Sequence, residues 1–179
     1  MNIQSLIYKN KTINWNLELI AFKPLTLLVG ASGVGKTQIL MAIINLQNIS
    51  RGNFLTGLLS GLEWKIKFLT QKGTSCEWQG SFESKDFLQE IMFDSKIKED
   101  NLPTIEYEKL FIAGKNVINR TKEGILFNEK ETVKLSPTES VIYLLKEEKQ
   151  VKEIHQEFEK VLFSSGKYGR FSQSLFLLC

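Results

Sequence analysis

A glycine-rich motif of eight residues near the N-terminus constrains the fold more than any other feature of this chain. It matches the pattern G-x-x-x-x-G-K-[S/T] in full, with Gly30, Ala31, Ser32, Gly33, Val34, Gly35, Lys36 and Thr37. Residues 25–29 before the motif are nearly all apolar, and in residues 39–46 after it apolar residues recur at helical spacing. This order predicts a strand covered on both faces of a parallel sheet, then a phosphate-binding loop, then a helix.

The chemistry of such a loop explains each residue type. Gly30, Gly33 and Gly35 permit the backbone to approach a phosphate chain closely. The helix that we expect to start near Gly35 offers unpaired N–H groups and the positive end of its dipole. We expect Lys36 to reach the β- and γ-phosphates and the Thr37 hydroxyl to ligate Mg²⁺. The implied cofactors are a nucleoside triphosphate and Mg²⁺, and the loop by itself does not select the base.

The rest of the chain alternates mainly between short strands and turns. Residues 2–8 and 13–19 read as strands, the second with a clear period of two, and residues 62–82 read as a β-hairpin. We expect further strands at Ile105–Ile112, Val117–Arg120, Ile125–Phe127 and Thr132–Leu135, arranged as an antiparallel meander.

The last expected element is a long helix. Ser136-Pro137-Thr138-Glu139 has the arrangement of a capping box with proline at the first helical position. Leu144, Val151 and Phe158 then follow at a spacing of seven. This repeat fits packing on another helix, but we favour an amphipathic helix on its own sheet because fewer than three clean heptads are present.

These elements predict an α/β fold: a P-loop NTPase lobe with an antiparallel β subdomain and a long C-terminal helix. We divide the chain into a strand–loop–helix core (1–60), an antiparallel β region (61–135) and a helical segment (136–179), which together form one incomplete ATPase domain.

Composition narrows the class of protein further. The net charge is only +3, but residues 1–60 carry five Lys or Arg against one acidic residue, a balance that suits a phosphate-bearing ligand. The two cysteines, Cys76 and Cys179, lie far apart, which argues against a disulfide framework. Neither a signal peptide nor an apolar run of membrane-spanning length is present, so we expect a cytoplasmic protein with no membrane partner.

The strand Trp15-Asn16-Leu17-Glu18-Leu19, the run Leu27-Leu28-Val29-Gly30 into the loop, and the helix Gln38-Ile39-Leu40-Met41-Ala42-Ile43 together resemble a known family. They look like the N-terminal, Walker A lobe of an ABC-type ATPase head of the SMC/RecF/OLD-like AAA family ATPases. That group includes DNA-repair and phage-defence ATPases, such as the ATPase of Septu-type systems. The resemblance implies ATP sandwiched between two heads, and hence a second lobe or homodimer partner. It also implies DNA or a nuclease as a further partner.

The chain departs from a complete head of that family, which has a signature loop, a Walker B strand ending in Asp-Glu and a switch histidine. Leu59-Ser60-Gly61 is only faintly like a signature and reads better as a loop before a strand. Ile91-Met92-Phe93-Asp94 is a weak Walker B candidate with Ser95 in place of the glutamate. The only histidine, His155, falls inside the last expected helix. Candidate Q-loop residues are Gln71, Gln79 and Gln89. We therefore assign no catalytic residue.

Two other functions stay open. A self-contained small P-loop kinase or GTPase fits the length, but there is no Asn-Lys-x-Asp motif, and the arginines are only Arg51, Arg120 and Arg170. A non-catalytic assembly module stabilised by nucleotide is the other alternative. Trp64 and Trp78 are of the type that stacks on bases, but their alternation indicates core positions.

Overall fold

The computed structural model describes residues 1–31, 35–53, 59–84, 102–132, 135–164 and 176–178. The strands are β1 (Asn2–Asn10), β2 (Trp15–Ala21), β3 (Leu62–Leu69), β4 (Ser75–Phe82), β5 (Ile105–Ile112), β6 (Lys115–Arg120), β7 (Ile125–Phe127), β8 (Lys130–Glu131), β9 (Leu162–Ser164) and β10 (Phe176–Leu178). The helices are α1 (Lys36–Ser50), α3 (Val141–Leu144) and α4 (Lys149–Glu159). None of these helices is long and apolar enough to cross a lipid bilayer.

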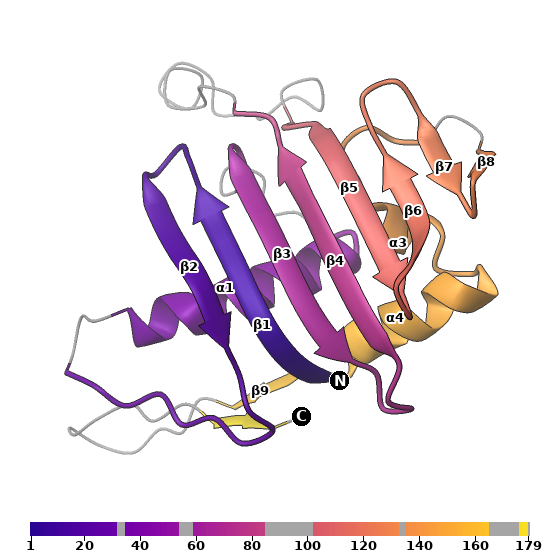
Figure 1. Cartoon of the computed structure of the whole chain (residues 1–179). Coiled ribbons are helices and arrows are strands. Elements are labelled where there is room, and N and C mark those ends of the chain that lie inside the picture. Colours follow the sequence, from indigo (N-terminus) through magenta and orange to yellow (C-terminus); the bar gives the residue numbers. More distant parts are fainter. Residues whose placement is uncertain (32–34, 54–58, 85–101, 133–134, 165–175, 179) are drawn as a thin grey trace.

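One large sheet dominates the molecule. Its order is β2-β1-β3-β4-β5-β6-β7-β8, and each neighbouring pair is antiparallel. Strands β3 to β8 therefore form a meander in chain order, while β1 lies between β2 and β3 (Figure 1). A separate pair, β9 and β10, forms a second sheet.

The strand predictions from period-two alternation are confirmed. Residues 62–82 form the expected hairpin, in which Trp64 pairs with Gly80 and Ile66 pairs with Trp78. The predicted strands at 105–112, 117–120 and 125–127 correspond to β5, β6 and β7. The strand predicted at 132–135 differs, because β8 is Lys130–Glu131 and residues 133–134 lie outside the described part of the chain.

The described helices cover one face of the large sheet and bury its apolar side (Figure 1). Phe158 of α4 packs edge-on against Phe68 and Trp78, with ring centroids 5.4 and 5.2 Å apart. Trp64 contacts Trp78 in the same edge-on manner. Both tryptophans are buried, so the prediction that they are core residues is confirmed, and neither is placed to stack on a base.

The predicted fold class is wrong. The main sheet is antiparallel throughout, so the structure is not an α/β P-loop NTPase lobe with a parallel sheet. Residues 25–29, expected as a strand buried on both faces, form no strand and are largely exposed. The physical reason is the sheet order: β2 is the edge strand, and no described strand lies beside residues 25–29.

The predicted long C-terminal helix is also wrong, because α3 and α4 are separate and the first has only four residues. Ile142 and Val151 are both fully buried. On one continuous helix, nine residues at about 100° each would place them on opposite sides, so burying both requires a break. The turn between the helices is closed by Glu148 N–H, which donates to Leu145 O at 2.9 Å.

The expected capping box at 136–139 does not start a helix either. Arg120 holds this segment in a non-helical bend, because its guanidinium donates to Ser136 O and Glu139 O, both at 2.6 Å. Ile105 N–H donates to Pro137 O at 2.9 Å. The helix α3 instead begins after Ser140, whose hydroxyl accepts from Ile142 N–H at 3.1 Å.

Candidate phosphate-binding site

The helix α1 begins directly at the predicted loop. Gly35 precedes it with φ 91° and ψ 6°, a left-handed conformation that favours glycine. The first backbone bond of the helix is from Ile39 N–H to Gly35 O at 3.2 Å. No side chain caps the helix, and no acidic residue lies in its first turn. The first amide donors of α1 are therefore available to an anion.

Lys36 folds back over the loop. Its ammonium donates to Gly30 O at 2.7 Å and to Ala31 O at 2.6 Å. These two carbonyls belong to the first residues of the motif, so the ammonium joins its two ends. Lys36 is also the first residue of α1, so its charge adds to the positive potential of the helix N-terminus.

Thr37 follows in the first turn of α1 and is exposed, so its hydroxyl is accessible to a ligand. Ser32, Gly33 and Val34 of the predicted site lie outside the described residues. The described donors are a helix N-terminus, an ammonium and a hydroxyl. This set fits a polyphosphate, and the Thr37 hydroxyl would be the ligand for a magnesium ion bound with it.

The approach to the loop is unusual for a phosphate site, because it lacks a supporting strand. After β2 the chain turns at Lys23, whose N–H donates to the Thr26 hydroxyl at 2.9 Å. Leu25 and Val29 are then 85% and 79% exposed. The loop is therefore anchored through α1 on one side, while its other side rests on an unpaired segment.

The faint signature candidate is part of the fold. Ser60 is fully buried, and its carbonyl accepts from the Thr12 hydroxyl at 2.8 Å. Gly61 adopts φ 65°, and its N–H donates to Glu83 O at 2.9 Å. Since this turn packs against the β1–β2 connection, its backbone is not free to bind a phosphate.

The other candidates that the structure describes are held elsewhere in the fold. Gln79 is on β4, where it pairs with Lys65 and Lys109. Asp94 and Gln89 lie outside the described residues. Gln71 accepts from Lys160 at 3.2 Å through its side chain, at the β3–β4 turn. His155 lies on α4, 4.0 Å from Glu159, and burial lowers its pKa. Among the described residues, no group of three or more His, Cys, Asp or Glu could hold a metal ion.

The structure also contains a buried polar network that the sequence reasoning missed. Glu108 is fully buried on β5 and accepts from Trp78 Nε1 at 2.9 Å, Ser140 Oγ at 2.6 Å and Val141 N–H at 2.8 Å. Burial raises the pKa of Glu108, and these donors together with Arg120 at 3.9 Å oppose that rise. Glu108 lies two residues before buried Leu110, and alternation along a strand places both side chains on the same face. This spacing was the sequence signal that could have indicated a buried glutamate.

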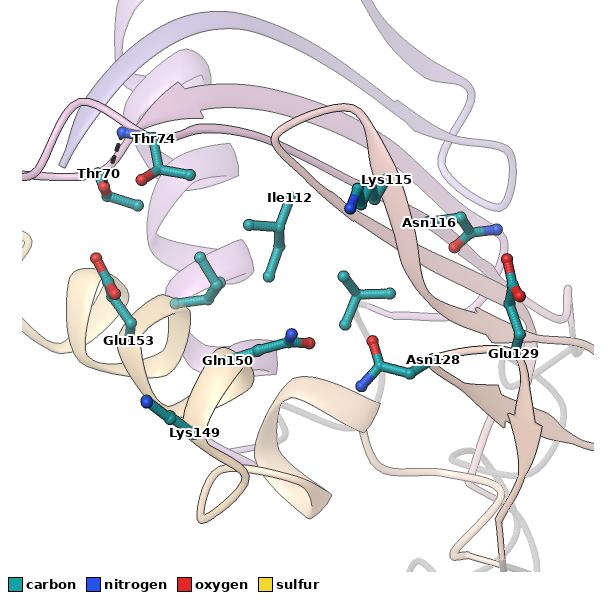
Figure 2. Close-up of a pocket in the computed structure, with 12 residues that line it drawn as sticks. Thr70, Thr74, Ile112, Lys115, Asn116, Asn128, Glu129, Lys149, Gln150 and Glu153 are labelled. Atoms are coloured by element: carbon teal, nitrogen blue, oxygen red, sulfur yellow. Dashed lines mark hydrogen bonds between the residues drawn. The ribbon is translucent and has the colours of Figure 1, made fainter.

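A pocket of about 740 Å³ lies between the β3–β4, β5–β6 and β7–β8 turns and the start of α4. Figure 2 shows polar side chains from each of these elements around it, including Lys115, Asn128, Gln150 and Glu153. No residue of the phosphate-binding motif lines this pocket. It is therefore distinct from the predicted site, and its mixture of both charges does not select a ligand class.

Comparison of the chain with protein-family models, curated proteins and solved structures found no match.

Proposed function

We propose that this chain is an ATP-binding subunit that holds ATP·Mg²⁺ through residues 30–37 and hydrolyses it only when a second polypeptide completes the site. The proposal includes a cytoplasmic location. The single observation that carries it is the full motif positioned at the uncapped start of α1, with Gly35 left-handed and Lys36 held in the loop.

Electrostatics supports binding of a polyphosphate. The carbonyl bonds of Lys36 are bonds to neutral acceptors, whereas phosphate oxygens would accept charge-assisted bonds, which are shorter and stronger. An incoming triphosphate therefore displaces the ammonium from Gly30 O and Ala31 O at a net gain. Magnesium would bridge the terminal phosphates to the Thr37 hydroxyl and reduce their repulsion.

Dependence on a partner follows from what the described residues do not supply. Hydrolysis of a nucleoside triphosphate needs a group that orients or activates water beside the terminal phosphate. Among the described residues, no carboxylate is hydrogen-bonded or ion-paired to the loop, and α1 has no acidic residue in its first turn. In line with the sequence resemblance to SMC/RecF-type heads, the proposal takes the missing groups to come from a second lobe or partner and takes DNA maintenance or phage defence as the setting of the activity.

Titration of the chain with a fluorescent ATP analogue in the presence of Mg²⁺ tests the proposal. Lys36→Ala removes the loop cation and is expected to weaken binding by about 10- to 100-fold, the equivalent of one or two lost charge-assisted bonds. Lys23→Ala is the matched control, because Lys23 is an exposed lysine outside the motif and its loss should leave the affinity unchanged. Circular dichroism should show both variants folded.

Three outcomes would contradict the proposal. Equal affinity of wild type and Lys36→Ala would refute the phosphate-loop assignment. Tighter binding of GTP than ATP would favour the GTPase alternative. Transfer of the terminal phosphate to a small acceptor by the isolated chain would favour a self-contained kinase.

A further inference from the structure

The α-amino group of Met1 is part of the packed core. Met1 is 7% exposed and belongs to the main cluster of buried hydrophobic residues. Its ammonium lies 2.7 Å from Oε2 of Glu157 on α4, and in Figure 1 the N-terminus lies beside that helix. The first residues of a domain are poorly ordered unless specific contacts hold them. Here the contact that holds Met1 is an ion pair made by the amine itself.

Glu157 depends on this amine for its charge balance. The residue is 3% exposed, and its Oε1 accepts from Gln71 N–H at 3.0 Å. Among the described residues, the Met1 ammonium is the one cation in ion-pair contact with Glu157, and Oε2 accepts no hydrogen bond from any other group. Removing one partner of a buried ion pair is strongly destabilising, because it leaves the other charge uncompensated.

An acyl group on the Met1 nitrogen would remove that partner. A formyl or acetyl group converts the ammonium into a neutral amide with a single N–H. It also adds a carbonyl group at a position that is almost fully buried together with Glu157. Extra atoms in a well-packed core force the surrounding side chains and backbone to shift. Loss of charge and overpacking therefore act against the same contact between β1 and α4.

We propose that the native fold of this chain requires a free α-amino group on Met1, and that acylation of this amine prevents the stable fold. For a chain synthesised with N-formylmethionine, the reaction that must come first is hydrolysis of the formamide. Water is consumed, the formyl C–N bond breaks, and the products are formate and the α-ammonium. Because the folded chain buries the amine, this hydrolysis has to act on the unfolded chain. The inference does not depend on nucleotide binding.

Cell-free translation of the whole chain tests the proposal. Translation with and without a peptide deformylase yields the free-amine and the formylated chain, which mass spectrometry identifies. In urea denaturation, the equilibrium constant for unfolding should be at least about 100-fold larger for the formylated chain. Treating that chain with deformylase in urea and then refolding it should restore the free-amine value. Equal stability of the two forms would overturn the proposal.

Glu157→Gln in both forms separates the ion pair from a purely steric effect. In the free-amine chain it should raise the unfolding constant by about 100-fold. In the formylated chain, where the cation is already absent, the change should be less than about threefold. Glu159→Gln is the matched control, because Glu159 is an exposed glutamate on the same helix and its substitution should alter neither form. Equal effects of Glu157→Gln in the two forms would exclude the ammonium as its partner.

The reactivity of the amine gives a second readout that needs only the free-amine chain. An amine-reactive ester at neutral pH, followed by peptide mapping, measures how fast the Met1 nitrogen is labelled. Labelling of the native chain should be at least about 100-fold slower than labelling in concentrated urea, because the amine reacts only after local opening. Glu157→Gln should speed up labelling of the native chain. Equal rates in the native and the denatured chain would show that the amine is not buried, and the proposal would fail.

Discussion

Trp78 Nε1 on β4 donates a hydrogen bond of 2.9 Å to Glu108 Oε1 on β5, inside the core of the protein. The same carboxylate receives Ser140 Oγ and Val141 N–H at the start of α3, so one buried side chain ties the middle of the sheet to the helical layer. Each of these partners is a donor. The network therefore requires an acceptor at both oxygens of residue 108.

We predict that Glu108→Gln lowers the free energy of unfolding by about 3 kcal/mol. A glutamine amide places an NH₂ group against Trp78 and Ser140 or against Val141, and it leaves the Arg120 charge without its partner. Urea denaturation followed by circular dichroism measures the change. Glu106→Gln on the same strand is the control. Its partners are the Ser81 hydroxyl at 3.0 Å, which a glutamine oxygen can also accept from, and the exposed Lys122 ammonium at 3.7 Å, a surface ion pair that contributes little, so a change within about 0.5 kcal/mol is expected. Equal effects of the two variants would show that the Glu108 network contributes nothing specific.

Gly80 is predicted to tolerate no side chain. A Cβ built at this position would lie 2.4 Å from Trp64 Cζ2 and 3.0 Å from Tyr107 O, and Trp64 is buried. Gly80→Ala should therefore destabilise the protein by about 1–3 kcal/mol through overpacking. For Gly124→Ala, the only atom of the described residues within 4 Å of the added Cβ is Glu131 Oε1 at 3.9 Å, so the thermal midpoint of this variant should stay near that of the wild type. A stable Gly80→Ala protein would mean that the β3–β4 pairing is not as tight as described.

We predict that the free energy of unfolding decreases at acidic pH because Glu157 becomes protonated. Its Oε2 lies 2.7 Å from the Met1 ammonium, and both groups are almost fully buried. Burial alone would raise the pKa of this carboxyl, but the ammonium and Gln71 N–H together hold the pKa below its ordinary value. The unfolded chain therefore binds a proton more readily than the folded one. The resulting stabilisation is present above a pH of about 4.3, the ordinary glutamate value, and is lost as pH falls through the lower folded-state pKa.

Urea denaturation from pH 7 to pH 3 checks this. Glu157→Gln should be less stable than wild type at pH 7 by about 2–4 kcal/mol and should show a shallower loss of stability toward acid. Glu129→Gln, a substitution of an exposed glutamate, should keep the wild-type slope. Parallel curves for wild type and Glu157→Gln would exclude Glu157 as the source of the acid dependence.

We predict that magnesium raises the affinity for ATP through the Thr37 hydroxyl of the loop. Thr37→Val removes the hydroxyl that we expect to ligate the ion while keeping the shape of the side chain, and Thr37 is exposed, so the fold should persist. Affinity for ATP with Mg²⁺ should fall by about tenfold, whereas affinity measured with EDTA should be the same for both proteins. A loss of the same size in EDTA would place the hydroxyl on the phosphates rather than on the metal.

The sequence predicted the elements whose signals are local. The alternating residues Leu62, Trp64, Ile66 and Phe68 form a strand that needs a pairing partner, and the chain supplies that partner within a few residues. Strands β3 and β4 pair as expected. The start of α1 was predicted from the glycines and the apolar spacing, and the structure begins the helix at Lys36. Most of the described site geometry therefore came from a short motif.

The errors concern partners that no local pattern specifies. The apolar run Leu25–Val29 reads as a buried strand, but burial needs neighbouring strands, and the described sheet does not extend to it. The capping box at 136–139 was overridden by Arg120, which comes from the far side of a turn and takes the carbonyls of Ser136 and Glu139. Glu108 was missed because an acidic residue in a strand gives no sign of its donors until the tertiary structure is known.

The position of β1 between β2 and β3 has a consequence for how the chain reaches its native state. The meander from β3 to β8 is built from pairings between consecutive strands, and apart from the β4–β5 connection (residues 83–104) these pairings close short loops at small entropic cost. Pairing of Asn10 with Leu62 must instead close a long loop that contains β2, the phosphate-binding motif and α1. Contact order therefore predicts that the meander nucleates folding and that β1 pairs with β3 in the slow step, so the β1–β2 end of the sheet would be the last part of the sheet to form.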